Sequence, residues 1–257
     1  MKIQSVAILG AGAVGSYVIW GLSQKEEIEL GIIAEGERKE RLQQNGCKIN
    51  GKVYRPNVWT PKEACGVDLL IVALKYGVLP EAMESIHKAV GEHTIVMSLM
   101  NGVNSEELIA KHIGKEKLLY SLIKVASHKE NDEYIFEPAT TIGIIFGEQT
   151  QPYQSERVKA VGELFENTGI HYRVTEDIME EIWSKFRLNV CNNLPQAILG
   201  AGVGCYEDSI HMNAIREGLR QELEAIAQAK GIDLSKVSAT SLHGSAVKKN
   251  ARFSTLQ

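Results

Sequence analysis

A glycine-rich turn between an apolar run and a helical segment constrains the fold of this chain more than any other feature. The run "SVAILG" is typical of a short strand that ends in glycine, and "AVGSYVIWGLSQ" is typical of a helix. Between them, Gly10, Gly12 and Gly15 form the pattern G-x-G-x-x-G. A helix that begins directly after such a turn points its free N–H groups and its positive dipole end at a phosphate.

The three glycines have distinct expected roles. We expect Gly10 to permit the tight turn, Gly12 to let the backbone approach a pyrophosphate, and Gly15 to let the helix pack on the sheet. Ala13 and Val14, at the start of the helix, belong to the same expected cofactor site.

An acidic residue supports this interpretation. Glu35 lies twenty positions past Gly15, at the end of the second expected strand. A dinucleotide-binding fold carries the acidic group that bonds the ribose there. The alternatives are a glycine-rich turn without a ligand, a bound flavin, or another nucleotide.

The rest of the first half alternates strands and helices. Expected strands at "IELGIIAE", "VDLLIVALK" and "TIVMSLMNG" alternate with helical segments, which predicts parallel βαβ units. Antiparallel strands are expected from "ENDEYIFEP" to "TTIGIIFGE". Helices are expected to follow at "SERVKAVGELFENTG", "DIMEEIWSKFRLNVCNNLPQAILG" and "SIHMNAIREGLRQELEAIAQAKG", with a last one from about Ser235 to the end. The sequence therefore predicts an α/β chain: an N-terminal Rossmann-type, doubly wound parallel sheet in residues 1–170, then a mostly α-helical domain in residues 171–257.

Composition excludes several classes of protein. The chain is 44% hydrophobic and 23% charged, so it can bury a core, and its net charge of −4 gives no reason to expect nucleic acid or a membrane surface as partner. The start "KIQSVAILG" lacks a signal-peptide pattern. The four cysteines show neither metal-ligand spacing nor a disulfide framework. We expect a cytoplasmic protein without a metal.

Two polar residues follow expected strands. Lys75 comes directly after "LLIVAL", and Asn101 begins "NGVNSEEL". Ligands of an open α/β sheet bind at the carboxyl ends of its strands, so both residues are candidates for a cofactor site. The alternatives are a solvated lysine at a strand end and an asparagine that serves only the turn.

A lysine and two asparagines recur at every fourth position of an expected helix. Lys185, Asn189 and Asn193 lie in "WSKFRLNVCNN", and this spacing places them on one helical face. Taken alone, Lys185 could equally be a surface lysine whose stem covers apolar side chains. Trp183 is expected to lie in the core.

These segments together resemble the ketopantoate reductases (2-dehydropantoate 2-reductases). The resemblance rests on "AILGAGAVGS", "LLIVALK", "NGV", the K-x-x-x-N-x-x-x-N spacing and the closing "STLQ", and it extends over the whole chain. It implies reduction of 2-dehydropantoate, a small keto acid, to pantoate by NADPH on the route to pantothenate and coenzyme A. It also implies an active site in the cleft between a Rossmann domain and a helical domain.

The resemblance also implies residue roles. Lys185 corresponds to the general acid of the family. Asn189 and Asn193 would bind the polar groups of the substrate, and Asn101 would position the ketone and the nicotinamide. Ser254 corresponds to a serine that binds the substrate carboxylate.

Two departures from the family pattern affect these expectations. Glu35 stands where family members often carry an arginine for the 2′-phosphate of NADPH, so NAD stays an alternative to NADP, although Arg38 and Lys75 could supply positive charge. The family carries an active-site glutamate about three helical turns beyond the position of Ser254, and no residue here takes that role. Reduction of another 2- or 3-keto acid and a dinucleotide-binding sensor therefore stay open. So does the oligomeric state, a homodimer included.

Overall fold

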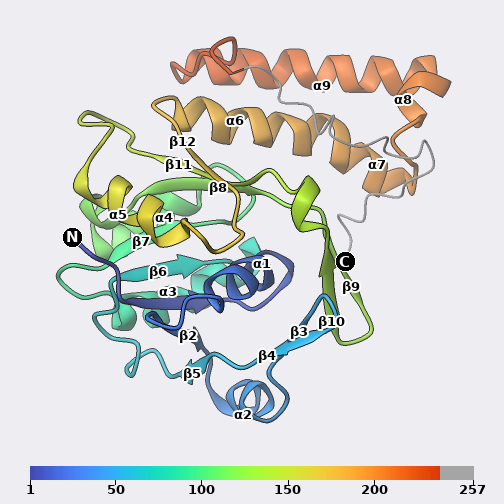
Figure 1. The fold of residues 1–257 in the computed structure, drawn as a ribbon. Coiled ribbons are helices and arrows are strands. Elements are labelled where there is room, and N and C mark those ends of the chain that lie inside the picture. The colour runs from blue at the N-terminus through green and yellow to red at the C-terminus, as the bar shows by residue number, and fades with distance from the viewer. Residues whose placement is uncertain (238–257) are drawn as a thin grey trace. The chain divides into compact units, whose positions relative to one another are not determined.

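The computed structural model describes residues 1–237 of the chain. The chain forms two compact units, Met1–Ile178 and Met179–Gln257. The first contains strands and helices, and the described part of the second is helical (Figure 1). The predicted order of an α/β fold followed by a helical region is confirmed.

A parallel five-stranded sheet forms the centre of the first unit. Its strand order is β5-β2-β1-β6-β7, with every neighbouring pair parallel. All residues of β6 and β7 are buried, as their continuously apolar sequences predicted. The strands are β1 (Ser5–Leu9), β2 (Glu29–Ile33), β5 (Asn57–Trp59), β6 (Leu69–Val72) and β7 (Ile95–Ser98).

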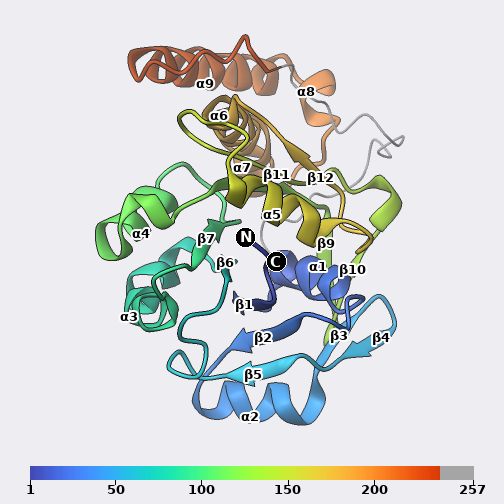
Figure 2. The same cartoon turned by 60° about the vertical axis from the view of Figure 1, so that its left-hand side comes forward.

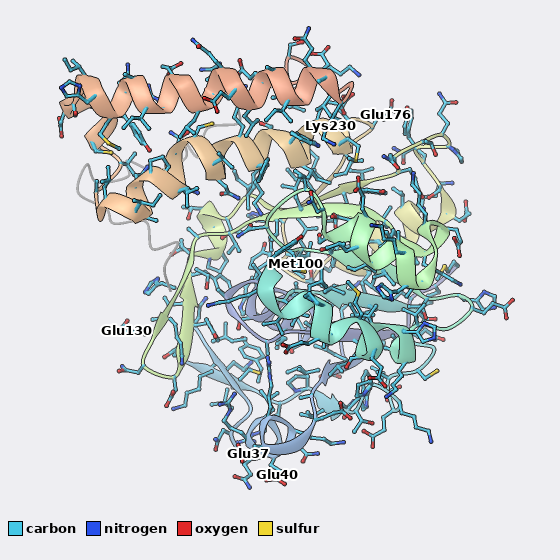
Figure 3. All side chains as sticks on the ribbon, turned by 180° about the vertical axis from the view of Figure 1, so that it is seen from behind. Glu37, Glu40, Met100, Glu130, Glu176 and Lys230 are labelled. Atoms are coloured by element: carbon cyan, nitrogen blue, oxygen red, sulfur yellow. The ribbon has the colours of Figure 1, made fainter. Side chains whose placement is uncertain are left out.

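Helices cover both faces of this sheet. Alternate strand residues divide between two buried clusters, one packed on α1 (Ala13–Leu22) and the other on α3 (Leu79–Ala89). Figure 2 shows these helices on opposite sides of the sheet. Every residue of α2 (Gly36–Asn45) is exposed or half-buried, and Glu37 and Glu40 point away from the protein (Figure 3). α4 (Ser105–Ile113) follows β7.

Two smaller sheets complete the first unit. The two strands expected from "ENDEYIFEP" to "TTIGIIFGE" are β10 and β11, and each is antiparallel to an earlier strand, β10 to β9 and β11 to β8. They do not pair with each other, because they belong to different sheets. A hairpin of β3 and β4 was not among the expected elements, although its turn at Asn50 and Gly51, both with positive φ, is a typical hairpin signal. The remaining elements are β3 (Cys47–Ile49), β4 (Lys52–Tyr54), β8 (Tyr120–Lys124), β9 (Ser127–Glu130), β10 (Glu133–Phe136), β11 (Gly143–Gly147), β12 (Tyr172–Val174), α5 (Glu156–Phe165) and the 3₁₀ turns Tyr76–Val78, Lys115–Lys117 and Pro138–Thr140.

The second unit corrects one prediction. The sequence indicated a single helix through "DIMEEIWSKFRLNVCNNLPQAILG", but α6 (Ile178–Leu188) ends in a π-helical turn, Asn189–Asn193, before α7 (Leu194–Leu199) begins. A short α8 (Cys205–Asp208) leads into the long α9 (Ile210–Ala229), which the sequence predicted. The last helix, expected from about Ser235 to the end, falls mostly outside the described residues.

None of the helices in residues 1–237 has the length and hydropathy needed to cross a bilayer.

Candidate active site

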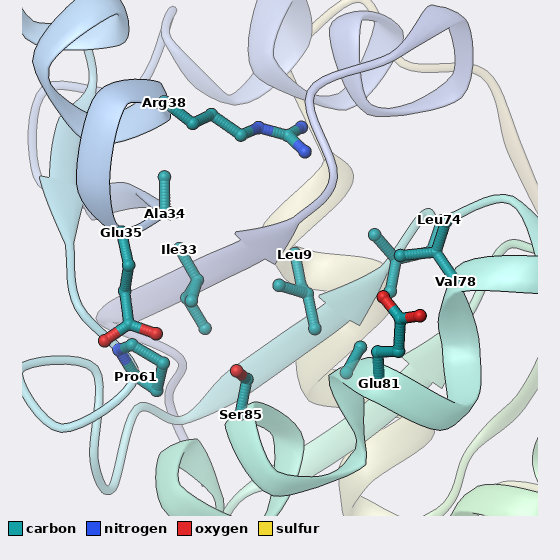
Figure 4. Close-up of a pocket in the computed structure, with 11 residues that line it drawn as sticks. Leu9, Ile33, Ala34, Glu35, Arg38, Pro61, Leu74, Val78, Glu81 and Ser85 are labelled. Carbon is teal, nitrogen blue, oxygen red and sulfur yellow. The ribbon is translucent and has the colours of Figure 1, made fainter.

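A pocket of about 190 Å³ lies at the carboxyl ends of β1, β2 and β6 (Figure 4). This is the edge at which open parallel sheets bind ligands. The apolar part of the lining is Leu9, Ile33, Ala34, Pro61, Leu74, Val78 and Ala82. The polar part is Glu35, Arg38, Glu81 and Ser85. An apolar pocket with a few polar groups in its lining suits a nucleoside.

Close packing at the glycine-rich turn explains two of its three glycines. Gly10 has a φ of +112°, and a Cβ atom on it would lie 2.4 Å from the carbonyl oxygen of Ala73. A Cβ atom on Gly15 would lie 1.9 Å from the carbonyl oxygen of Gly10. The expected reason for Gly15 therefore needs refinement: the closest obstacle is the turn itself, and the side chain of Ile8 lies farther off, at 3.5 Å.

The third glycine faces open space. No atom of the described residues lies within 4 Å of the position that a Cβ atom on Gly12 would occupy. Protein packing therefore does not require a glycine there, whereas close approach of a ligand to the backbone would. Gly12 is also the N-cap of α1 and has no side chain to accept from the first-turn N–H groups, which include those of Ala13 and Val14. These features fit the pyrophosphate of a dinucleotide.

The charged residues of the pocket point in different directions. The guanidinium of Arg38 extends from α2 toward the loop that follows β1, whereas the carboxylate of Glu35 lies beside Pro61 (Figure 4). Both side chains are exposed, so each can meet a ligand at the pocket mouth. Arg38 and Glu35 thus place a cation and a carboxylate at the start of α2. This combination is compatible with NADP and with NAD.

Lys75 and Asn101 lie at the same edge of the sheet. Lys75 is exposed and precedes the 3₁₀ turn Tyr76–Val78 beyond β6. Asn101 is exposed in the connection between β7 and α4. Because β1, β6 and β7 are parallel neighbours, the structure brings both residues to the edge that carries the glycine-rich turn.

A buried chain of hydrogen bonds underlies the turn after β7. The Ser105 hydroxyl donates to the Glu106 carboxylate at 2.7 Å, and the Ser98 and Ser105 hydroxyls lie 2.8 Å apart. Since a hydroxyl has one proton, the Ser98 hydroxyl donates to Ser105. The Ser121 hydroxyl donates to the Ser98 carbonyl at 2.8 Å. These four side chains are all buried. No sequence pattern singles these residues out, because "SEEL" alone is typical of an ordinary helix start.

The lysine and the asparagines lie where the helix changes its winding. Lys185 is half-buried in the last turn of α6, while Asn189 and Asn193 belong to the π-helical turn. The amide of Asn193 donates to the side-chain oxygen of Asn189 at 2.9 Å, so these two residues share a face as predicted. Trp183 is buried and packs edge-on against Phe186, which confirms its expected place in the core.

The neighbouring cysteine offers no reactive group. Cys191 is buried within the π-helical turn, and burial raises the pKa of its thiol, so it stays protonated at neutral pH. Within residues 1–237, no three His, Cys, Asp or Glu side chains gather as a metal site. Ser254 lies outside the described residues.

Comparison with known proteins places these features in a family. The family model "Ketopantoate reductase PanE/ApbA" matches residues 6–148, and "Ketopantoate reductase PanE/ApbA C terminal" matches residues 177–257. The 2-dehydropantoate 2-reductase of Mesorhizobium japonicum is 25% identical over 255 residues, which cover 88% of this chain and 77% of that protein.

Solved structures agree. The 2-dehydropantoate 2-reductase of Geobacter metallireducens is 28% identical, with a TM-score of 0.76 over 89% of this chain and 76% of that one. D-Mandelate dehydrogenase, determined with NADH and anilino(oxo)acetate, matches with a TM-score of 0.79 over 93% of this chain and 77% of that one. At 18% identity, this second match speaks for the fold alone.

A Rossmann-type unit with a dinucleotide pocket, followed by a helical unit, defines the class of NAD(P)H-dependent oxidoreductases. The chain belongs to the ketopantoate reductase PanE/ApbA family.

Proposed function

We propose that this protein reduces 2-dehydropantoate to pantoate with NADPH, in the cytoplasm, as a step toward pantothenate and coenzyme A. The observation that carries the proposal is the Lys185–Asn189–Asn193 arrangement in a chain whose two halves both match the family. These polar residues recur at every fourth position of one amphipathic helical segment.

Each candidate residue has its own role in the proposed reaction. When bound, the reduced nicotinamide supplies the hydride that reaches the keto carbon. Lys185 donates a proton to the ketone oxygen as negative charge develops there, and its ammonium stabilises that charge. Asn189 and Asn193 offer amide groups to the polar groups of the substrate without adding charge. Asn101 orients the ketone, and Ser254 binds the carboxylate.

The choice of NADPH is supported by the positive charge beside the glycine-rich loop. Arg38 extends toward that loop, while the carboxylate of Glu35 lies beside Pro61, so of these two charged groups the guanidinium lies nearer the loop (Figure 4). A guanidinium binds phosphate with two parallel hydrogen bonds. NADH is the alternative, because D-mandelate dehydrogenase, a protein of the same fold, has been described with it.

A steady-state assay tests the proposal. Purified protein is supplied with 2-dehydropantoate, or with a panel of other 2- and 3-keto acids, and with NADPH or NADH in turn. The highest kcat/KM is expected for 2-dehydropantoate with NADPH. Preference for another keto acid would replace the substrate and keep the reaction class. Tight cofactor binding without turnover of any keto acid would overturn the proposal in favour of a dinucleotide sensor.

One substitution tests the cofactor assignment. If NADPH is the cofactor, Glu35→Arg should keep or strengthen NADPH binding and raise the NADPH/NADH ratio of kcat/KM. A charged hydrogen bond contributes about 1.5–3 kcal/mol, so the change should be roughly ten-fold or more. Glu37→Arg, a charge change on the outward face of α2, is the matched control. An unchanged ratio in Glu35→Arg would mean that Glu35 does not face the cofactor.

A further inference from the structure

The helix that carries the candidate catalytic lysine is interrupted at the asparagines. In the π-helical turn Asn189–Asn193, the backbone N–H of Leu194 donates to the carbonyl of Asn189, five residues back. An α-helix would direct that N–H to Val190 instead, four residues back. Single π-helical turns inside α-helices are rare and occur frequently at functional sites, so this one needs a cause.

A proline provides the cause. Pro195 lies two positions beyond the turn, and it has no N–H to donate. In an uninterrupted α-helix, residue 195 would donate to the carbonyl of Cys191. Cys191 is buried, and a buried carbonyl without a donor is costly. Continuing the α-helix through Pro195 would therefore leave an unsatisfied group in the core.

A tyrosine in α8 donates to a backbone carbonyl of the π-helical turn. The hydroxyl of Tyr206, in α8, donates to the carbonyl of Asn192 at 2.6 Å and lies 3.4 Å from the carbonyl of Cys191. Tyr206 is buried, and burial raises the pKa of its hydroxyl, which therefore stays protonated and able to donate.

Further contacts hold the tyrosine ring in place. The guanidinium of Arg216, in α9, lies 4.9 Å from the ring centroid of Tyr206, and its Nη2 donates to Asn213 at 2.5 Å. The ring is thus held from α9, while the hydroxyl is bonded to the π-helical turn.

The winding of this turn decides where the asparagines point. A π-helical turn holds more residues than an α-helical turn, so it rotates everything beyond it relative to everything before it. Lys185 lies before the turn, and the two asparagines lie within it. Their side chains meet across it, Asn193 donating to Asn189 at 2.9 Å.

We propose that Pro195 and Tyr206 are positioning residues, which maintain the π-helical turn and thereby set the directions of Asn189 and Asn193 relative to Lys185. Pro195 has no N–H to donate in the α-helical register, and the Tyr206 hydroxyl donates to the carbonyl of Asn192 in the π-helical one. The proposal rests on the proposed function, because it matters to catalysis only if the asparagines bind the keto acid.

Two variants separate positioning from plain structural support. Pro195→Ala restores an N–H and makes the α-helical register available, so the melting temperature should stay the same or rise, while kcat/KM for the keto acid falls. Tyr206→Phe removes one hydroxyl and keeps the ring under Arg216. Loss of one hydrogen bond corresponds to about a 3- to 10-fold change in an equilibrium or rate constant. We expect kcat/KM to fall by this factor in each variant. The Kd of the reduced cofactor should stay unchanged.

Matched controls and a double variant sharpen the test. Pro138→Ala and Tyr134→Phe, in the first unit and outside the pocket lining, should leave kcat/KM as in the wild type. Because Pro195 and Tyr206 act on one turn, the double variant should lose less activity than the product of the two single losses. The proposal would be overturned if the loss of kcat/KM in the double variant equalled the product of the two single losses. It would also be overturned if the Pro195→Ala protein were more stable than the wild type and kept wild-type kcat/KM.

A structural measurement distinguishes failure of this proposal from failure of the proposed function. A crystal structure of the Pro195→Ala variant should show the N–H of Leu194 bonded to Val190 in place of Asn189. If the wild type reduces no keto acid, the proposed function fails, and this change of register is still observable. A π-helical turn that persists in both variants overturns the positioning role, whatever the activity.

Discussion

The candidate sites in the two units of this protein consist of different chemical groups, backbone N–H groups in the first and side chains in the second. At the sheet edge of the first unit, the proposed contacts to the pyrophosphate come from backbone N–H groups. Gly10 and Gly15 permit the close packing of this turn, and Gly12 leaves its backbone open to a ligand. In the second unit, the candidate groups are the side chains of Lys185 and two asparagines. Their directions depend on the winding of one helix.

This difference determines how each region fails. A backbone site depends on the space that its glycines leave free, so an added methyl group either distorts the fold or blocks the ligand. A side-chain site tolerates changes in packing as long as its helix keeps the same register. It loses its chemistry when a single functional group is removed. The first region should therefore couple stability to binding at Gly10 and Gly15, where packing requires a glycine, but not at Gly12. The second region should separate stability from catalysis.

The largest expected effect breaks the second region and leaves the first intact. Lys185→Ala should lower kcat by ~10²–10⁴-fold, the usual contribution of general acid catalysis. Cofactor affinity should stay unchanged, because the dinucleotide pocket lies in the first unit. Steady-state kinetics together with calorimetric titration of NADPH checks both statements. Wild-type turnover in this variant would remove Lys185 from the mechanism.

A matched pair of glycine variants breaks the first region in two different ways. Gly15→Ala forces a Cβ atom to within 1.9 Å of the Gly10 carbonyl oxygen, and overpacking of this kind costs about 1–3 kcal/mol. Its melting temperature and its cofactor binding should fall together. Gly12→Val adds its side chain to open space, so the protein should fold as the wild type does and lose dinucleotide binding. Equal destabilisation in both variants would contradict this division of roles.

The buried chain under the turn after β7 tests whether the first region also depends on side chains. Ser105→Ala removes a hydrogen bond to the Glu106 carboxylate and should lower the free energy of unfolding by about 1.5–3 kcal/mol. Ser121→Ala removes a neutral bond to the Ser98 carbonyl and should cost about 0.5–1.5 kcal/mol. Urea denaturation of both variants measures the difference. The reverse order would mean that the carboxylate does not anchor the chain.

The smallest effect concerns the packing of α6 against α9. Glu224 accepts from Arg220 at 2.8 Å and from Arg187 at 2.6 Å, and these bonds hold the pKa of its carboxyl below the ordinary value of 4.5. A pKa that is lowered by folding stabilises the protein above the unfolded value, and this stability is lost as the pH falls through the folded value. The pairs are partly exposed, so only about 0.2–1 kcal/mol is expected.

Thermal unfolding at two pH values measures this effect. Glu224→Gln should have a lower melting temperature than the wild type near neutral pH, and the difference should vanish well below pH 4.5. Glu222→Gln, an exposed carboxyl on the same helix, should show no such dependence. A difference that persists in acid would mean that packing, and not charge, is lost in the variant.

The sequence predicted the parts of the fold that depend on periodicity and spacing. The apolar runs at β6 and β7 indicated buried parallel strands, and the three glycines indicated the turn between β1 and α1. It could not predict features that depend on distant residues. The π-helical turn requires Tyr206, which lies eleven positions beyond Pro195 and has no local pattern in common with it.

The candidate site shows the same limit. Spacing alone placed Asn189 and Asn193 on one face, because four residues make about one turn in either winding. Spacing could not reveal the buried chain of Ser98, Ser105 and Glu106, since its members come from different elements and meet only in the folded core. Proline within a helical pattern was the available signal for the interruption.

The close fit of β5 against β2 has an optical consequence. A Cβ atom on Gly31 would lie 2.1 Å from the indole ring of Trp59, so the glycine makes room for that ring beside the pocket edge. The Ala34 N–H donates to the Trp59 carbonyl at 2.9 Å, and Ala34 lines the pocket. The emission wavelengths of tryptophan overlap the absorption band of a reduced nicotinamide. Energy transfer to a bound reduced dinucleotide should therefore quench the fluorescence of Trp59. The protein thus carries its own reporter of cofactor occupancy, which can be read without substrate, label or turnover.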